Sequence, residues 1–516
     1  MLATALLATP AGASTPQATS CGNLQQAIDT LAAQANHGAG AVIVLDGLCT
    51  AGSLGSSHGV SLPAGSSFTL EGKPRSTSGF NGAGISGPLL STSGSEEAGA
   101  IVLANLTFED ASLSEASALS LRAARVTLSG DTFESNSEEG SMGSAARIEV
   151  GSNASTCPPA SGPPVLTLAH SRFLENTLTV AGGAGSGGAA LVHDECGQSR
   201  ALVEGNIFEG NVIHSSGASG EDQVTGAGLQ VTSSEAQIPL VSQRANVFDS
   251  NSIIASHPAL GDYGGGGEWL QYARLQSVDD RFSRNLAAGT DSPLNWSWAG
   301  GLGIDALPCG VPLVESLLDN AVVSGNVLTS GNRESLGGGG IWVGCSHLRV
   351  FDSTFTENSA PNGAAIEGEG GDQLQLTNSI LAGDEGGSEI AGFDGAGSSQ
   401  AVSYSDLCAS SGAPAPFPGT GNICANPRLA DAGRPSSFDV RETASSPTVN
   451  AGSNALIPAG LSADFYGNHR VLAAHCARAG KLARMRRPVV DIGASELRCN
   501  TNAKSPAAPR RNSKSR

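Results

Sequence analysis

The sequence has few aromatic and few charged residues. Phe, Trp and Tyr make up 4% of the chain and Asp, Glu, Lys and Arg 15%, whereas Gly occurs 69 times in 516 residues. Typical soluble domains carry ~25% charged residues. This composition disfavours a helical enzyme and favours short strands joined by tight turns. Because single compact cores stop growing near ~250–300 residues, a chain of this length is several domains or one elongated array, and the composition favours the array.

Long apolar runs are also missing. Beyond the first residues, no stretch has the ~18 consecutive apolar residues that a membrane-spanning helix needs. The segment Met1–Ala13 is apolar and ends in the small residues Ala11 and Ala13, as the end of a secretory signal peptide does, although it has no basic residues before the apolar stretch. We therefore expect residues 1–20 to be a leader and the protein to be secreted or exposed on the cell surface, with its true translation start left open.

No C-x-x-C motif occurs, which disfavours zinc-binding and thioredoxin-like proteins. The ten cysteines instead fit an oxidising compartment. Pairing each cysteine with its nearest neighbour predicts five disulfides, although the sequence alone leaves the connectivity open. They are Cys21–Cys49, Cys157–Cys196, Cys309–Cys345, Cys408–Cys424 and Cys476–Cys499.

Basic residues are scarce except near the C-terminus. The formal net charge is −19, but residues 478–516 contain 11 Lys and Arg and 2 Asp and Glu, which leaves −28 for the other 477 residues. An acidic body argues against nucleic-acid partners, because binding to phosphates needs Lys and Arg. We expect residues 500–516 to form a basic, disordered tail.

A repeat of the form F-x-x-N runs through the middle of the chain at steps of 32 to 41 residues. Phe108 and Ile380 resemble degenerate outer copies, with Ala111 and Gly383 in place of Asn. One inner copy has Val323 in place of Phe and keeps its Asn as Asn326. The other full copies are Phe133/Asn136, Phe173/Asn176, Phe208/Asn211, Phe248/Asn251, Phe282/Asn285 and Phe355/Asn358.

Most copies of the repeat have similar neighbours. An alternating segment such as Leu166–Leu168 precedes several of them, and a glycine cluster with another apolar segment, such as Gly187–Val192, follows. Each unit therefore offers about three short strands with one apolar face. A single unit does not bury that face, whereas stacking at the ~4.8 Å strand spacing buries it continuously.

These features predict an all-β fold, a right-handed parallel β-helix over residues 61–400. In such a coil Phe stacks on Phe inside, Asn stacks on Asn at a bend, and Gly provides a positive-φ corner before the third strand. The separations of Cys157 from Cys196 and of Cys309 from Cys345 match one turn of the coil.

The two ends of the chain are expected to be caps. In Asn23–Ala35 the apolar residues fall on one helical face, and Asn23 with Gln26 suggests a capping box. Residues 21–60 are therefore expected to form a helical cap that is followed by a strand at Val42–Leu45. Residues 401–499 are dense in Pro, Gly and Asn and are expected to form an irregular cap that closes the far end.

The GGA-[LI] and F-x-x-N motifs resemble the repeats of polymorphic outer-membrane proteins and related bacterial β-helix adhesins of the pectin-lyase-like superfamily, over roughly residues 100–383. The later motifs resemble the choice-of-anchor Q domain of bacterial surface proteins. Asn450 stands where that pattern usually has Asp, and the Arg-rich insertion Ala474–Arg487 separates its last two motifs. The motifs are Asn426–Leu429, Ser446-Pro447 with Asn450–Gly452, Asp464 with Gly467 and Arg470, and Asp491–Glu496. The resemblance implies a surface or secreted location and an adhesion-like role.

Because that superfamily also contains polysaccharide lyases and hydrolases, clustered carboxylates are candidates for catalysis. The best pair is Asp279 and Asp280, which also fits ordinary turn residues of the repeat. Residues Gly300–Pro308 match one copy of a calcium-binding nonapeptide, with Asp305 as the ligand, but a calcium roll needs tandem copies. We therefore expect no cofactor, with Ca²⁺ as the one alternative.

Aromatic residues gather in one stretch and would suit stacking on sugar rings if they are exposed, or core packing if they are not. They are Tyr263, Trp269, Tyr272, Trp296, Trp298 and Trp342.

The sequence favours a monomeric, secreted or cell-surface β-helix with a non-catalytic role in adhesion or envelope contact, with a polysaccharide or a surface protein of a neighbouring cell as partner. The alternative is a polysaccharide lyase or glycoside hydrolase. The ligand and the anchoring route stay open.

Overall fold

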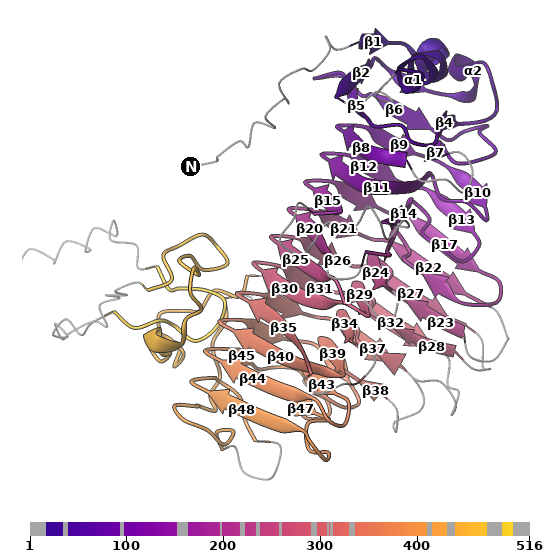
Figure 1. Cartoon of the computed structure of the whole chain (residues 1–516). Helices are drawn as coiled ribbons and strands as arrows, with labels where there is room; N and C mark the ends of the chain where they lie inside the picture. Colours follow the sequence, from indigo (N-terminus) through magenta and orange to yellow (C-terminus); the bar gives the residue numbers. More distant parts are fainter. Residues whose placement is uncertain are drawn as a thin grey trace, which may run out of the picture.

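The computed structural model of the chain is an all-β parallel β-helix, in which short strands stack rung upon rung (Figure 1). The described residues are 17–34, 40–92, 98–151, 164–196, 199–216, 222–233, 238–256, 261–289, 297–306, 309, 313–329, 336–409, 415–430, 439–471 and 488–498. The expected leader up to residue 16, the basic tail, Cys157, Trp296, Cys476 and Cys499 lie outside them.

The largest sheet, sheet A, has 23 strands in two adjoining columns, which share strand β11 (Leu119–Ser129). All its strand pairings are parallel, and alternate residues point inward, as in the buried, intermediate, buried pattern of β5. The first column contains β1 (Gln17–Thr19), β2 (Ala41–Leu45), β5 (Phe68–Gly72), β8 (Ala98–Ala104), β15 (Leu166–Ala169), β20 (Arg200–Glu204), β25 (Leu240–Arg244), β30 (Arg274–Val278), β35 (Val314–Asp319), β40 (Ser346–Phe351), β44 (Gln373–Thr377) and β48 (Ser399–Ser403). The second contains β4 (Val60–Leu62), β7 (Leu90–Thr92), β14 (Ala146–Val150), β19 (Ala190–Asp194), β24 (Leu229–Ser233), β29 (Glu268–Gln271), β34 (Leu302–Asp305), β39 (Ile341–Gly344), β43 (Ile366–Gly368) and β47 (Ile390–Ala391).

Sheet B carries the Phe of the repeat at the inward position of most of its strands. From Phe80 to Phe282 seven rings stack with centroids 4.6–5.4 Å apart, until Val323 interrupts the stack in register with Phe282 and Phe355. The prediction of a Phe stack is confirmed. The strands are β3 (Leu48–Cys49), β6 (Gly79–Asn81), β9 (Thr107–Glu109), β12 (Thr132–Glu134), β16 (Arg172–Leu174), β21 (Ile207–Glu209), β26 (Val247–Asp249), β31 (Arg281–Ser283), β36 (Val322–Ser324), β41 (Thr354–Thr356) and β45 (Ile380–Leu381).

The Asn of the repeat forms a ladder at the bend after sheet B, as predicted. Each Nδ2 donates to the side-chain oxygen of the next rung, with distances of 2.8–3.0 Å from Asn136 to Asp384. Each Nδ2 also donates to a carbonyl of the preceding rung, as Asn251 does to Phe208 at 2.9 Å. Buried amides in the ladder are thus satisfied along the axis of the coil.

The copy of the repeat without a Phe differs from the others in its ring stack but not in its ladder. Asn326 is fully buried, and its Oδ1 accepts from Asn285 Nδ2 at 2.9 Å. The Nδ2 of Asn326 donates to Asn358 Oδ1 and to the carbonyl of Phe282, both at 2.9 Å. The prediction that Asn326 belongs to the repeat is therefore confirmed, although the smaller Val323 leaves this rung without an aromatic ring in sheet B.

The last copy of the repeat differs from the prediction by one residue. Leu381, not Ile380, pairs with Phe355, and Asp384, not Gly383, accepts the hydrogen bonds of Asn358. Because side chains alternate between faces, this one-residue offset turns Ile380 outward.

Two further sheets contribute to the turns, sheet C with nine strands and sheet D with five. Sheet C follows the Asn ladder, and sheet D is a fourth sheet, where about three strands per turn were expected. Sheet C contains β10 (Ser112–Ser114), β13 (Ser137–Glu139), β17 (Thr177–Val180), β22 (Val212–Ser215), β27 (Ser252–Ala255), β32 (Leu286–Gly289), β37 (Val327–Thr329), β42 (Ser359–Ala360) and β46 (Glu385–Gly386). Sheet D contains β18 (Gly185–Ser186), β23 (Asp222–Thr225), β28 (Gly261–Gly264), β33 (Ser297–Trp298) and β38 (Leu336–Gly337).

The glycine clusters form the corner before the second column of sheet A. Gly187, Gly226, Gly265 and Gly338 have φ of +67° to +78°, as predicted for a positive-φ corner. In the cluster near residue 300 it is Ala299, with φ +53°, that takes this position. The glycines that follow allow close approach, since a Cβ on them would meet the carbonyl of the next rung.

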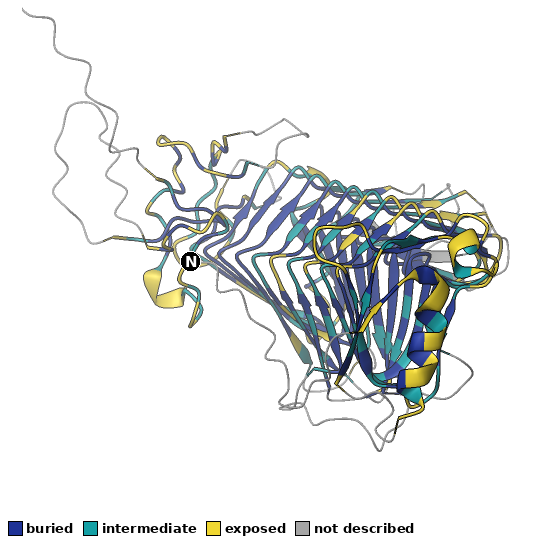
Figure 2. Ribbon diagram, turned by 90° about the horizontal axis from the view of Figure 1, so that it is seen from above, coloured by how far each residue is buried: buried dark blue, intermediate teal, exposed yellow. Residues whose placement is uncertain are grey.

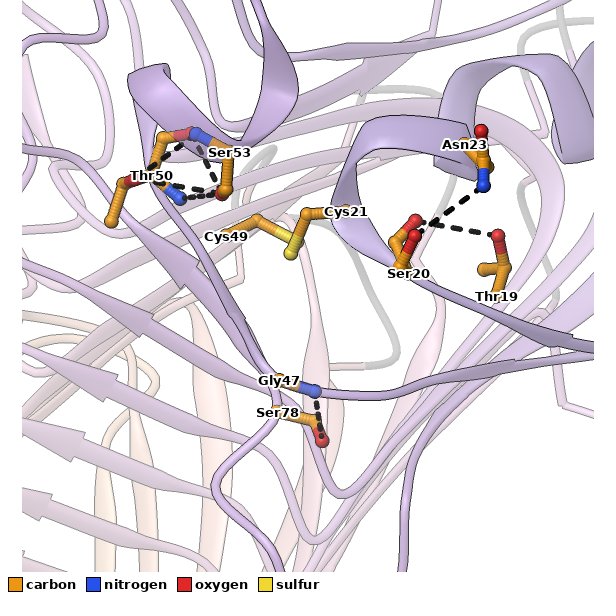
Figure 3. Close-up of a disulfide and its surroundings, with 9 residues drawn as sticks. All are labelled: Thr19, Ser20, Cys21, Asn23, Gly47, Cys49, Thr50, Ser53 and Ser78. Atoms are coloured by element: carbon orange, nitrogen blue, oxygen red, sulfur yellow. Dashed lines mark hydrogen bonds between the residues drawn. A yellow bond between two sulfur atoms is a disulfide. The ribbon is translucent and has the colours of Figure 1, made fainter.

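The N-terminal end is covered by helix α1 (Leu24–Ala32), which has a buried and an exposed face (Figure 2). Its buried face includes Leu24, Ile28 and Leu31. The predicted capping box at Asn23 is wrong, because Asn23 belongs to the 3-10 turn η1 (Cys21–Asn23) and its side chain makes no capping bond. A capping box occurs instead at α2 (Ala51–Leu54), between Thr50 and Ser53. Figure 3 shows the disulfide Cys21–Cys49, which joins η1 to the end of β3.

The C-terminal region both extends and flanks the coil. Residues 405–409 and 415–425 continue past the last rung, with Leu407 and Phe417 on the main core. Residues 439–471 and 488–498, which include the 3-10 turn η2 (Asn454–Leu456), pack against the side of the coil, where Asn378 exchanges hydrogen bonds with Ser453. This segment lies beside β35 to β45 in Figure 1, whereas the sequence suggested that it closes the end.

Three of the five predicted disulfides lie within the described residues, namely Cys21–Cys49, Cys309–Cys345 and Cys408–Cys424. Cys309–Cys345 links equivalent corners of two adjacent rungs, with a Cα separation of 4.7 Å. Cys196 is also disulfide-bonded. In the part of the chain that the structure describes, no helix is long and apolar enough to cross a membrane.

Candidate functional site

Asp279 and Asp280 lie at the corner between sheets A and B and point to different sides of it. Asp279 has φ +62° and faces outward, where it accepts a hydrogen bond of 2.6 Å from Asn320. Asp280 is fully buried and accepts from Ser277 Oγ at 2.5 Å and from the backbone N–H of Asn246 at 2.6 Å. The two carboxylates therefore do not converge on a common ligand.

Asp280 is one member of a second polar ladder. The residue two positions before each Phe of the repeat accepts from the rung before it, as Asn206 accepts from Ser171 at 2.9 Å and Asn246 from Asn206 at 3.0 Å. Burial raises the pKa of Asp280 to about 7, against its hydrogen bonds with Ser277 and Asn246. Its structural role in the corner accounts for its position.

A buried acid and amide lie inside the coil close to Asp280. Glu268 occupies an inward position in register with Leu229 and Leu302, is fully buried, and accepts a hydrogen bond from Gln243 Nε2. Burial, reinforced by the charge of Asp280, raises the pKa of Glu268 well above its ordinary value. A neutral carboxylic acid paired with an amide is the form that a dry core tolerates.

The aromatic candidates are mostly buried. Tyr263 is 1% exposed, packs between sheets C and D, and donates to the carbonyl of Thr329. Trp269 and Trp342 stack at 5.6 Å above Gly303, and the partly buried Trp298 packs on both.

The stacking of Trp269 on Trp342 requires the glycine between them, since a Cβ on Gly303 would lie 2.1 Å from the Trp269 ring. Tyr272 is half-buried at a positive-φ corner. These rings therefore fill space beside sheet D and do not form an open stacking surface. Asp305 ends strand β34, is 7% exposed, and belongs to no group of three potential metal ligands among the described residues.

The site that stands out is a groove of about 850 Å³ between sheets C and A, just before the first strand of sheet D. We call it the Glu138 groove. Glu138 occupies a position of sheet C that is apolar in the neighbouring rungs, with Leu113 on one side and Leu178 on the other. Its side chain is 3% exposed, and its Oε2 has no hydrogen-bond partner among the described residues.

The environment of Glu138 raises the pKa of its carboxyl group towards neutral pH. Burial raises the pKa of Glu138 to about 7, against backbone hydrogen bonds from Met142 and Ser141 and the charge of Arg147. A buried acid in an apolar column costs folding free energy, which marks it as a candidate for a functional residue.

The walls of the Glu138 groove are polar and carry both charge signs. Hydroxyl groups come from Ser and Thr on strands and turns, acidic groups from Glu115 and Glu139, and a guanidinium from Arg147, which also pairs with Glu149 at 2.7 Å. Such a mixture of donors and acceptors suits a neutral, hydroxyl-rich ligand better than a strongly charged one.

The sequence contained a signal for Glu138. In the other copies the second residue after the Asn of the repeat is apolar, as in Leu178, Ile213 and Ile253. Only the copy at Asn136 has an acidic residue at this place.

Three of the four motifs that resemble the choice-of-anchor pattern meet in a buried cluster of polar and charged residues. Arg470 is 2% exposed and contacts Asp352 of the coil at 2.8 Å and Glu496 at 3.7 Å. Asp464 accepts from the backbone N–H of Glu496 at 2.8 Å, and Asp491 accepts from that of Asn450 at 2.6 Å. Arg470 thus joins the flanking segment to the coil, and the other two hydrogen bonds join parts of that segment to each other.

No protein-family model matches the chain, and no curated protein matches it.

Proposed function

We propose that the protein is an extracellular β-helix that binds a polysaccharide non-catalytically through the Glu138 groove. The observation that carries the proposal is the buried Glu138 in an otherwise apolar column beside a polar groove. The three disulfides and the elongated, acidic body support an extracellular, surface-contact role.

The test separates loss of binding from loss of folding, because replacing Glu138 by an apolar residue also makes the inward position of sheet C apolar in three successive rungs. Glu138→Leu restores the residue type of Leu113 and Leu178, so we expect it to raise thermal stability while it abolishes retention on an immobilised polysaccharide. Glu134→Gln, on the exposed face of the neighbouring strand, is the matched control and leaves retention unchanged. The assay uses a panel of acidic and neutral polysaccharides with and without Ca²⁺. Failure of the wild-type protein to bind any of them, or equal binding by Glu138→Leu, refutes the proposal.

One observation favours hydrolysis as a second candidate function. A carboxyl group with a pKa near 7 is a suitable general acid for glycosidic bond cleavage, and Glu115 and Glu139 line the same groove. In that case new reducing ends appear on incubation with the polysaccharide, and Glu138→Gln stops cleavage while it retains binding. Binding without new ends leaves the non-catalytic function.

A further inference from the structure

A second groove, of about 980 Å³, lies at the C-terminal end of the coil between sheets B and C and residues 424–429. We call it the acidic groove. Four carboxyl side chains line it, and none of its described lining residues is Lys, Arg or His. The four are Glu357, Glu385, Glu389 and Asp406.

The acidic groove is distinct from the Glu138 groove, with which it shares no lining residue. Along the Asn ladder the two grooves are six rungs apart, from Asn136 beside the first to Asn358 beside the second. At ~4.8 Å per rung this is a separation of roughly 29 Å, so one small ligand does not span both grooves.

In the acidic groove, the buried carboxyl group of Asp406 has one oxygen without a hydrogen-bond partner among the described residues. Its side chain is 1% exposed; Oδ1 accepts from the backbone N–H of Ala425 at 2.9 Å, whereas Oδ2 has no hydrogen-bond partner among the described residues. Burial raises the pKa of Asp406 to about 6. A cationic group in the groove would offset this desolvation.

The geometry disfavours a single metal ion. Among the described residues, no three His, Cys, Asp or Glu side chains lie close enough together to hold one, whereas Ca²⁺ takes about 6–8 oxygen ligands. The positive charges of a ligand would therefore have to be spread along the groove.

Apolar side chains between the carboxyl groups suit long, flexible cations. Val327 and Ala382 line the groove with half-buried side chains, together with the disulfide Cys408–Cys424, whereas Leu381 and Leu429 are buried. The methylene stems of Lys and Arg pack on such surfaces while their charged ends reach carboxylates. Because the lining comes from successive rungs, the groove runs along the coil in steps of ~4.8 Å.

We propose that the acidic groove binds an extended peptide segment rich in Lys and Arg. This site is separate from the Glu138 groove, and the proposal does not depend on polysaccharide binding. It gives the protein a protein partner of basic character in addition to its glycan.

The experiment measures the fluorescence anisotropy of a labelled peptide of alternating Arg and Gly, titrated with the full chain. The groove variant is Glu357→Gln/Glu385→Gln. The control is Glu175→Gln/Glu209→Gln, which removes two carboxylates from earlier rungs of the coil. Glu175 has φ +55° and Glu357 has φ +60°, so these two positions are equivalent in backbone conformation.

We expect the groove variant to bind the peptide about tenfold more weakly than the wild type, and the control to stay within about twofold, since two charge-assisted contacts are lost only in the former. Three results overturn the proposal: no binding by the wild type, equal weakening in the control, or displacement of the peptide by stoichiometric Ca²⁺. Circular dichroism of each variant verifies that the coil is intact.

Discussion

The Asn ladder makes a sharp prediction for the variant Asn251→Ala. Asn251 is fully buried, and its side chain takes part in four hydrogen bonds: its Nδ2 donates to Phe208 and Asn285, and its Oδ1 accepts from the backbone N–H and Nδ2 of Asn211. Alanine leaves at least two buried donors of Asn211 without their acceptor. At ~1–3 kcal/mol for each unsatisfied group, we expect a loss of ~2–6 kcal/mol.

The assay for Asn251→Ala combines guanidinium unfolding with hydrogen exchange, because each rung of a solenoid contacts only its neighbours. Faster exchange should be confined to the rungs of Asn211, Asn251 and Asn285. Ser252→Ala, at the next, outward position of β27, serves as the control and should change stability by less than about 0.5 kcal/mol. A loss below about 1 kcal/mol for Asn251→Ala, or exchange that is unchanged in the neighbouring rungs, would refute the reasoning.

Two further predictions concern the flanking segment. Arg470→Met removes the cation that contacts Asp352. Because breaking a buried ion pair by removal of one partner costs about 3–5 kcal/mol, we expect residues 439–471 to become sensitive to protease while the coil stays protected. Equal loss in both regions would contradict this. Burial raises the pKa of Glu442 from 4.5 to about 8 and that of Glu496 from 4.5 to about 10. Above pH 4.5 the folded state therefore holds protons that the unfolded chain has released. The contribution of these two groups to stability is thus largest at acid pH and falls as the pH rises from 4.5 towards 8 to 10. Thermal melting at constant ionic strength should give a higher Tm at pH ~5 than at pH ~9, with a smaller difference in Glu442→Gln; the opposite order would contradict the assignment.

The repeat made the coil predictable because its key residues recur at equivalent positions. Phe173 and Asn176 recur at steps of about one turn, and only a stacked architecture aligns them. The second polar ladder carried the same kind of signal, since Asn206, Asn246 and Asp280 each lie two residues before a Phe. This signal is obscured at Asp280, because two adjacent acidic residues resemble a catalytic pair, whereas Asp279 and Asp280 face opposite sides of a corner.

The copy with Val323 shows that the two halves of the motif act independently. Asn326 keeps all its ladder hydrogen bonds without a ring in its own rung. Phe80 and Phe108, in turn, belong to the ring stack although Ala83 and Ala111 stand at the Asn position, so each residue marks a turn without the other. A buried amide needs its partners, whereas an apolar position accepts side chains of several sizes.

Sheet D and the flanking segment could not be predicted in the same way. The strands of sheet D, such as Gly261–Gly264 and Ser297–Trp298, share no residue pattern, because only their backbones pair. Without that sheet the burial of Tyr263 and Trp269 could not be anticipated. The docking of Arg470 on Asp352 joins residues 118 positions apart, and neither position has a local signal for the other.

The Asn ladder keeps its geometry when the number of residues between successive rungs changes, whereas a strand does not tolerate a change in its own length. Between consecutive ladder residues the chain runs for 26 to 41 residues, yet the distance from each Nδ2 to the next side-chain oxygen stays at 2.8–3.0 Å. Additions to a connecting loop leave this register intact, whereas one extra residue within a strand would turn its apolar face to solvent. Evolution can therefore lengthen or shorten this molecule by duplicating or deleting whole turns, each of which moves its two ends apart or together by ~4.8 Å without altering the cross-section.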